Sequence, residues 1–275
     1  MSHENAALPN LTFENIYIDV ISGDGGEVAG SMRASRLDNA GLAAGNFTLS
    51  FDGWPGSENL VVDLSASELE TEGLSGYIDG LPSSLSQVGV LSGHVAIEME
   101  NKILAAASAD VTLNNGILNV PGIRRNAAFN NADLIVAYDM ARNNLTVSKA
   151  ELEMANNRQL SFVGIVDQFH APSSSVIGTI EAKNLPVQAL LDDWPDAVAS
   201  DLNTAIKKQV NGGRFKMVKV KFKGVYQSKT SALALVKLDL ESKFSAVRVN
   251  LSNGQYQRLV ATIDGGLGMS VGSDG

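Results

Sequence analysis

The sequence contains no cysteine and only three histidines, and several kinds of functional site are therefore excluded at once. Without cysteine the chain forms neither disulfide bonds nor thiolate metal sites. The histidines lie far apart in the sequence and make no spaced ligand pair: His3, His94 and His170. No P-loop and no Gly-x-Ser-x-Gly nucleophile elbow is present, and no acidic segment has the spacing of a calcium loop. We therefore expect no metal, no cofactor and no catalytic residue.

Basic residues and long apolar runs are also scarce. Lys and Arg number 21 against 30 Asp and Glu, which gives a net charge of −9. This balance argues against a general nucleic-acid binder, because phosphate binding needs clustered Lys and Arg. No segment reaches the roughly 18–20 apolar residues of a membrane span, and residues 1–9 lack the pattern of a signal peptide. We expect either an unanchored, cytosolic protein or a piece of a longer exported protein.

What the sequence does contain is strict alternation of apolar and polar residues. Hydrophobic residues make up 44% of the chain but aromatics only 6%, so its apolar surface is mainly aliphatic. The clearest alternating sets are Ile16, Ile18 and Val20; Phe47, Leu49 and Phe51; Leu60, Val62 and Leu64; and Val95, Ile97 and Met99. A period of two indicates strands with one buried face. Turn signals occur roughly every 8–12 residues, which is typical of antiparallel meanders. They predict turns at residues 24–26, 54–56, 139–144 and 156–158 and a hairpin turn at the Asn-Asn-Gly of residues 114–116. We predict a mainly β fold with strands over residues 11–183 and 213–264.

One region, residues 186–211, breaks this alternation. Its apolar residues recur at the i, i+3, i+4, i+7 spacing of an amphipathic helix, with a kink at Trp194-Pro195 and a stop at the glycines that follow. The apolar face of this predicted helix consists of Leu190, Leu191, Trp194, Val198, Leu202 and Ile206. After residue 264 the chain is rich in Gly and Ser, so residues 265–275 are predicted to form a flexible tail beyond a single elongated domain, 1–264.

Two polar features leave alternatives open. The adjacent apolar residues Met217 and Val218 shift the phase of their strand by one residue, which predicts a β-bulge. Around them lies a stripe of Lys216, Lys219, Lys221 and Lys223, which is either a headgroup-binding surface or a solvated strand face that protects a sheet edge. His94 alternates with Val95 and is expected to face solvent, although a pocket joining His94 or His170 to a serine and a carboxylate would indicate a hydrolase.

The segment at the predicted helix resembles a known family. Leu185, Pro186 and Val187 are followed by Leu190 and Leu191 and then by Trp194 and Pro195. This pattern is similar to the Leu-Pro-Val-x-x-Leu-Leu-x-x-Trp-Pro helix of the AsmA-like superfamily, in particular its large YhdP- and TamB-type members of Gram-negative bacteria. The strand before it, residues 178–184, the restart of the sheet at 211–215 and the stretches 115–122 and 129–145 also resemble that family. The resemblance covers roughly residues 90–230.

The resemblance implies a bridge-like lipid-transfer protein of the cell envelope. Its members build a long, twisted antiparallel sheet curled into a U-shaped groove, along which phospholipid acyl chains are proposed to move between the inner and outer membranes. They are periplasmic and anchored to the inner membrane, and their partners are neighbouring β-groove segments and membrane proteins. The implied function is therefore a lipid-binding or lipid-transfer groove module, with the predicted helix capping the groove. Alternation alone fits equally well a structural or adhesive β-sandwich domain with no ligand.

Overall fold

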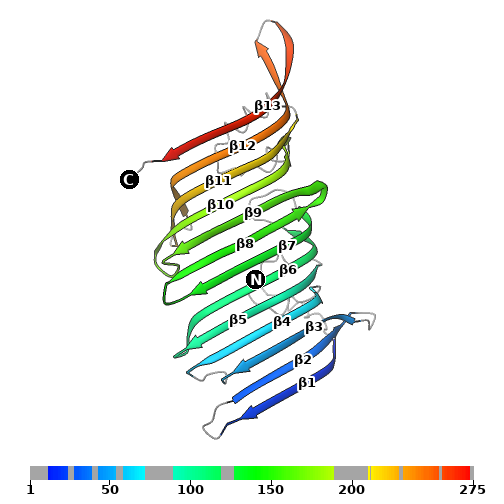
Figure 1. Cartoon of the computed structure of the whole chain (residues 1–275), viewed down its shortest axis with the longest axis vertical. Helices are drawn as coiled ribbons and strands as arrows, with labels where there is room; N and C mark the ends of the chain where they lie inside the picture. The colour runs from blue at the N-terminus through cyan, green and yellow to red at the C-terminus, as the bar shows by residue number, and fades with distance from the viewer. Residues whose placement is uncertain are drawn as a thin grey trace, which may run out of the picture. The chain divides into compact units, whose positions relative to one another are not determined.

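The computed structural model confirms a mainly β protein whose described strands belong to one antiparallel sheet (Figure 1). The structure describes residues 12–23, 28–38, 43–53, 58–71, 89–118, 127–188, 210, 212–228, 232–253 and 256–272. The thirteen strands are β1 Thr12–Ser22, β2 Val28–Leu37, β3 Ala43–Asp52, β4 Leu60–Glu70, β5 Val90–Glu100, β6 Ile103–Leu118, β7 Ala127–Asp139, β8 Asn144–Met154, β9 Arg158–Asp167, β10 Ser173–Pro186, β11 Arg214–Gln227, β12 Ala232–Asn253 and β13 Tyr256–Gly272. Their order in the sheet is their order along the chain, so β1 and β13 are its two edge strands.

Contacts divide the chain into two units. Unit 1 comprises Met1–Leu118 and Ala128–Ser148, and unit 2 comprises Asn119–Ala127 and Lys149–Gly275, so that the division passes through β8. Each unit is described below by itself.

Short turns that contain asparagine connect β5 to β6, β7 to β8 and β8 to β9. Asn101 and Lys102 alone join β5 to β6, and both have positive φ, at 50° and 64°. Two consecutive positive φ values are the requirement of a two-residue type I′ turn, whose twist matches that of the flanking strands. The turns that the sequence predicts near residues 139–144 and 156–158 are confirmed, and the second contains the 3₁₀ turn η3, Ala155–Asn157. The predicted turns at residues 24–26 and 54–56 lie outside the described residues.

A β-bulge in β4 keeps its apolar residues on one face. The pairing of β4 with β5 shifts between Ala66 and Leu69, and the intervening Glu68 has a φ of 51°. The Glu68 N–H donates a hydrogen bond to the Ser92 hydroxyl oxygen at 2.9 Å, which satisfies a backbone group that the ladder does not use. Ala66 and Leu69 therefore share a face although they are three residues apart.

A similar β-bulge, also with a positive φ and a side-chain acceptor for the backbone N–H, occurs in unit 2. The pairing of β12 with β13 shifts between Phe244 and Val247, where Ala246 has a φ of 52° and its N–H donates to the Asp264 carboxylate at 2.8 Å. In β11 the register with β12 shifts between Phe215 and Met217, which confirms the predicted bulge.

Two sequence predictions need correction in this region. The predicted flexible tail is wrong as far as Gly272, because residues 265–272 belong to β13 and pair with β12. Backbone pairing with β12 keeps this glycine-rich segment in a strand. The ring of Phe244 lies beside Gly265, where the absence of a side chain leaves room for the ring. A hairpin predicted at residues 114–116 is also wrong, because β6 continues to Leu118 with a positive φ at Asn115.

The predicted kinked helix is not part of the described fold. Its predicted first residue, Pro186, is instead the last residue of β10 and pairs with Arg214. Val187 and Gln188 then adopt a helical conformation, and Val187 is buried. Residues 189–209 lie outside the described residues, so the helix and its kink remain a prediction from sequence.

Candidate functional site

In unit 1 the strand register collects the apolar residues of six strands on one face. Residues directly opposite one another on paired strands point to the same side of a sheet. One transverse row across β1 to β6 consists of Ile18, Met32, Leu49, Leu64, Val95 and Ala109. The next row consists of Val20, Gly30, Phe51, Val62, Ile97 and Ala107. We call this surface the unit 1 apolar face, and no polar side chain interrupts either row.

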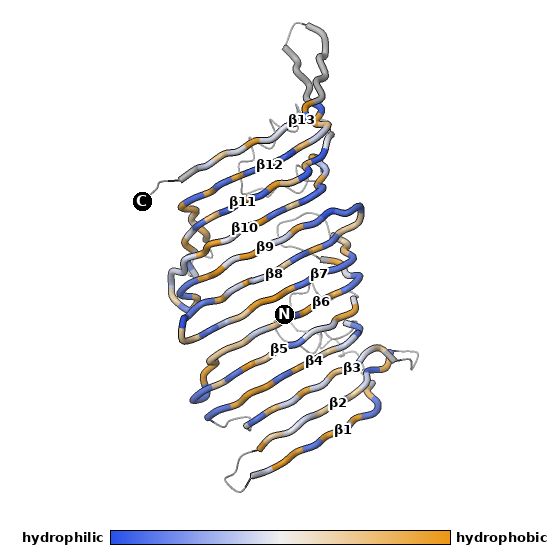
Figure 2. Tube along the Cα trace, viewed as in Figure 1, coloured by the Kyte–Doolittle hydropathy of each residue, from blue (hydrophilic) through white to orange (hydrophobic). Residues whose placement is uncertain are grey.

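The opposite side of unit 1 is mostly polar. Its corresponding rows are Asp19, Ser31, Ser50, Asp63, Ala96 and Ser108, and Tyr17, Arg33, Thr48, Ser65, His94 and Asp110. On this face the Arg33 guanidinium lies 5.0 Å from the centre of the Tyr17 ring. Figure 2 shows the resulting alternation of hydrophobic and hydrophilic residues along the strands.

Unit 2 repeats the arrangement across β9 to β13. One row consists of Phe162, Ile180, Val220, Leu240 and Met269, and a neighbouring row consists of Leu160, Ala182, Val218, Ser242 and Leu267. A third row contains Gly164, Gly178, Phe222 and Leu238. We call this surface the unit 2 apolar face. Its one polar member in these rows, Ser242, turns its hydroxyl to the Leu267 carbonyl oxygen at 3.5 Å.

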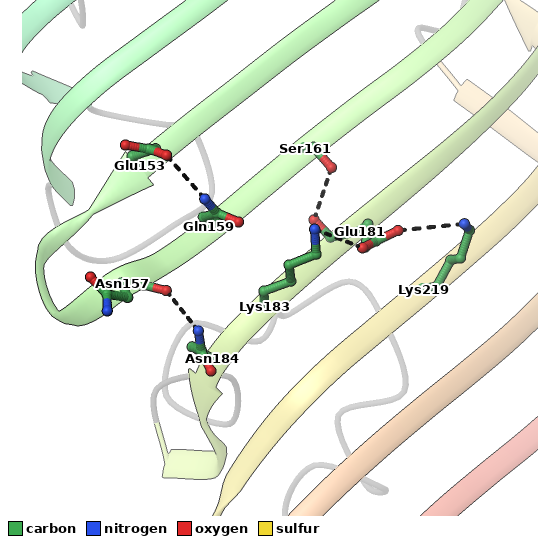
Figure 3. Close-up of polar contacts among 8 residues, drawn as sticks. All are labelled: Glu153, Asn157, Gln159, Ser161, Glu181, Lys183, Asn184 and Lys219. Carbon is green, nitrogen blue, oxygen red and sulfur yellow. Dashed lines mark hydrogen bonds and ion pairs between the residues drawn. The ribbon is translucent and has the colours of Figure 1, made fainter.

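The polar side of unit 2 is a ladder of paired charges. Glu181 lies opposite Lys219, which lies opposite Glu241, and Lys221 lies opposite Asp239. The Glu181 carboxylate is 3.3 Å from the Lys183 ammonium and 3.4 Å from that of Lys219 (Figure 3). Opposite charges on directly facing residues stabilise a strand pair.

These contacts set the charge state of Glu181 and favour one of the two alternatives for the lysine stripe. Burial on the strand would raise the pKa of Glu181, but hydrogen bonds and charge attraction from Lys183 and Lys219 outweigh it and leave the pKa below its ordinary value. Because β11 lies between β10 and β12, its lysines do not protect a sheet edge. Lys219 and Lys221 instead face carboxylates across the strands, as expected of a solvated strand face.

Large side chains on both apolar faces remain accessible. In unit 1 the exposed fractions of Ile18, Val20 and Leu64 are 62%, 52% and 40%, and in unit 2 Leu267 is 58% exposed. In the same unit Met269, Leu160 and Ile180 are 46%, 40% and 37% exposed. The remaining large residues of these rows are half-buried rather than buried. All the described strands belong to one sheet, so within the described ranges no second sheet covers these faces.

Both described histidines lie on exposed surfaces. His94 Nε2 lies 3.0 Å from an Asp63 carboxylate oxygen on the neighbouring strand, and the two side chains are 48% and 43% exposed. Ser65 lies opposite His94, but the ring nitrogen is bonded to Asp63 on an open, polar strand face. His170 stacks edge-on against Phe169 in an exposed turn. Among the described residues there is also no group of His, Asp or Glu that fits a metal ion.

The candidate site thus differs from the one that the helix pattern predicts. The predicted site residues Leu190, Leu191, Trp194, Val198, Leu202 and Ile206 all lie outside the described residues. The residues that the structure brings together are the strand positions already marked by alternation. Sequence reasoning missed the glycines within the strands of the apolar faces. Each of two such glycines lies directly opposite a phenylalanine, in the pairs Gly30–Phe51 and Gly178–Phe222. A glycine inside an alternating strand pattern is the signal that could have found them.

No protein-family model matches the chain, and neither a curated protein nor a solved structure matches it. None of the described helical residues forms a helix long and apolar enough to cross a membrane.

Proposed function

We propose that this chain is a lipid-binding groove module of the AsmA-like type, which takes part in phospholipid transport between the inner and outer membranes. The observation that supports it is the pair of apolar faces, whose rows cross six strands in unit 1 and five in unit 2 and keep large aliphatic side chains accessible. Soluble proteins rarely leave large contiguous apolar surfaces open unless something binds there.

The dimensions of one row suit one acyl chain. Neighbouring strands lie about 4.8 Å apart, so the five gaps between six strands span about 24 Å. The hydrocarbon core of a bilayer is about 30 Å thick and contains two leaflets, so a single acyl chain extends over about 15 Å. A row such as Ile18 to Ala109 is therefore long enough for a whole chain laid across the strands.

The chemistry of the rows suits movement as well as binding. Each methylene group removed from water contributes about 0.8 kcal/mol, without any directional bond that would fix the position of the chain. The rows offer aliphatic and phenyl groups and no charged side chain, so a lipid is able to shift along them without breaking a hydrogen bond. The polar faces stay hydrated through groups such as Asp63 and the Glu181–Lys219 pair.

The finer parts of the proposal rest on the family resemblance. In that arrangement the sheet curls into a U-shaped groove in the periplasm, and further β-groove segments, inner-membrane proteins and outer-membrane proteins adjoin it. Residues 186–211 would cap the apolar face through the residues from Leu190 to Ile206. No reaction is catalysed, because guiding acyl chains along an apolar surface requires no catalytic group.

Site-specific photo-crosslinking tests the proposal. A photoreactive amino acid at Leu49 faces the unit 1 apolar face, whereas the same group at the adjacent Ser50 faces the polar side. After incubation with phosphatidylethanolamine–phosphatidylglycerol vesicles, we expect acyl-chain adducts at position 49 and not at position 50. Native mass spectrometry of detergent-free preparations should show phospholipid bound to the unmodified chain.

Bare protein mass in repeated preparations, together with equal labelling at positions 49 and 50, would refute lipid binding. That outcome would favour a structural or adhesive β domain without a ligand.

A further inference from the structure

Several phenylalanine rings of this protein lie against glycines of adjacent strands. Of the nine phenylalanines, five place ring atoms within 3.3 Å of the position where the side chain of a glycine on an adjacent strand would begin: Phe51, Phe129, Phe162, Phe222 and Phe244. The glycines are Gly30 for Phe51, Gly116 for Phe129, Gly178 for both Phe162 and Phe222, and Gly265 for Phe244. A ring in that position leans across the gap between strands and lies close to the sheet, instead of standing upright to interlock with a second layer.

The most developed example is on the unit 2 apolar face. Gly178 lies directly opposite Gly164 on β9 and Phe222 on β11, and Phe162 is two positions along β9 from Gly164. A Cβ atom added at Gly178 would be 2.8 Å from a carbon of the Phe162 ring and 2.8 Å from a carbon of the Phe222 ring. The nearest atoms are all at the far ends of the two rings, and none is backbone. Gly178 is buried beneath them, whereas both rings are only half-buried.

We propose that Gly178 holds the rings of Phe162 and Phe222 flat against the sheet, and that these rings are an acyl-chain contact surface that depends on the missing side chain. This inference rests on the proposed lipid-binding function and assigns the residues that make the unit 2 surface smooth. The three residues are called the aromatic plate below. Phe51 over Gly30 is the equivalent feature in unit 1, where a ring carbon lies 2.6 Å from the added Cβ position.

The missing side chain matters because it determines how far the two rings stand above the sheet. Carbon atoms in contact prefer separations of about 3.5–4.0 Å, so a methyl group at position 178 would displace both rings by about 1 Å or rotate them away from the sheet. A raised Phe162 ring would interrupt the row from Phe162 to Met269, to which this ring belongs, and a raised Phe222 ring would stand above the neighbouring Val220 and Leu240 of that row. A flexible chain lies flush on flat rings but loses contact on either side of a raised one.

Gly178→Ala is the direct test, and Gly268→Ala is its matched control. Gly268 lies on the polar side of the same unit, opposite Glu241, and an added Cβ there would meet only the Leu240 carbonyl oxygen, at 4.0 Å. Binding of a fluorescent straight-chain phospholipid is measured for the wild type and both variants, with circular dichroism and the thermal midpoint as checks of folding. We expect about tenfold weaker binding for Gly178→Ala, as the loss of contact with roughly two methylene groups predicts, and unchanged binding for Gly268→Ala.

A local readout separates the plate from a general loss of structure. A photoreactive amino acid at Val220, in the row beside the plate, should lose its acyl adduct in the Gly178→Ala background, while one at Leu49 in unit 1 keeps it. Wild-type affinity in a folded Gly178→Ala variant would overturn the inference and leave the proposed function intact. Absence of lipid binding by the wild type would refute both.

If Gly178→Ala fails to fold, Phe222→Leu replaces it, because this change removes a ring without adding an atom near the backbone. The inference then requires about tenfold weaker binding, and unchanged affinity overturns it.

Discussion

Replacing Leu64 by glutamine tests whether the unit 1 apolar face is an accessible surface or a dry core. Leu64 lies in the middle of its row, between Leu49 on β3 and Val95 on β5. Its side chain is 40% exposed, so about three-fifths of it is shielded by the neighbouring strands. Glutamine has a similar length and adds a polar amide, which water can reach only if the face is open.

The expected magnitude follows from that exposure. Complete burial of a leucine contributes about 1.5–3 kcal/mol, so three-fifths of this amounts to about 1–2 kcal/mol. The amide adds little further cost if it remains hydrated. If a second layer covered Leu64, the buried amide would lack a partner and would add about 1–3 kcal/mol, for a total near 4 kcal/mol or more.

Urea denaturation followed by circular dichroism gives the free energy of unfolding of the wild type and of Leu64→Gln. Ser65→Gln is the control, because Ser65 is the next residue on β4, is exposed and faces the polar side. We expect a loss of about 1–2 kcal/mol for Leu64→Gln and within about 0.5 kcal/mol of no change for Ser65→Gln. A loss of 4 kcal/mol or more at position 64 would refute the accessible face and support a closed sandwich.

Two further predictions concern polar groups of unit 2. Glu181→Gln should lower the free energy of unfolding by on the order of 0.5–1 kcal/mol at neutral pH, because it removes the contacts with Lys183 and Lys219. The folded-state pKa of Glu181 is below its ordinary value of 4.5, so this contribution is present above pH 4.5 and is lost as the pH falls through the lowered pKa. The free energies of unfolding of the wild type and the variant, measured by urea titration, should therefore converge in acid. A difference that stays constant with pH would contradict the assigned cause. Asp264→Ala should lower the free energy of unfolding by about 1 kcal/mol, because it removes the acceptor for the Ala246 N–H. Asp264→Asn keeps an acceptor oxygen and should lower it by less in the same titration. Equal losses for the two variants would show that this hydrogen bond does not stabilise the bulge.

Much of the fold follows from local sequence pattern. The alternation of Leu60, Val62 and Leu64 with polar residues predicts a strand with one apolar face, and β4 has that face. The bulge near Met217 was also predictable, since two adjacent apolar residues on one strand cannot both face the same side.

Other elements were not predictable, because their conformation depends on distant partners. The segment 265–272 has the composition of a flexible tail, but it is ordered as a strand by its pairing with β12. Asn114 to Gly116 has the composition of a hairpin turn, yet β6 continues through it. In both cases the backbone ladder with a neighbouring strand overrides the local preference for turns and loops.

By itself, the sequence determined that each strand has an apolar and a polar side, because side-chain direction along a strand depends only on its period of two. Only the tertiary structure decided which strands are neighbours and in what register, and therefore that Ile18 and Ala109 belong to one row although they are far apart in the chain. Register also placed Gly178 between the rings of Phe162 and Phe222. The physical reason is that hydrogen-bonded pairing is a relation between strands, and no pattern within one strand specifies the residue that lies opposite it.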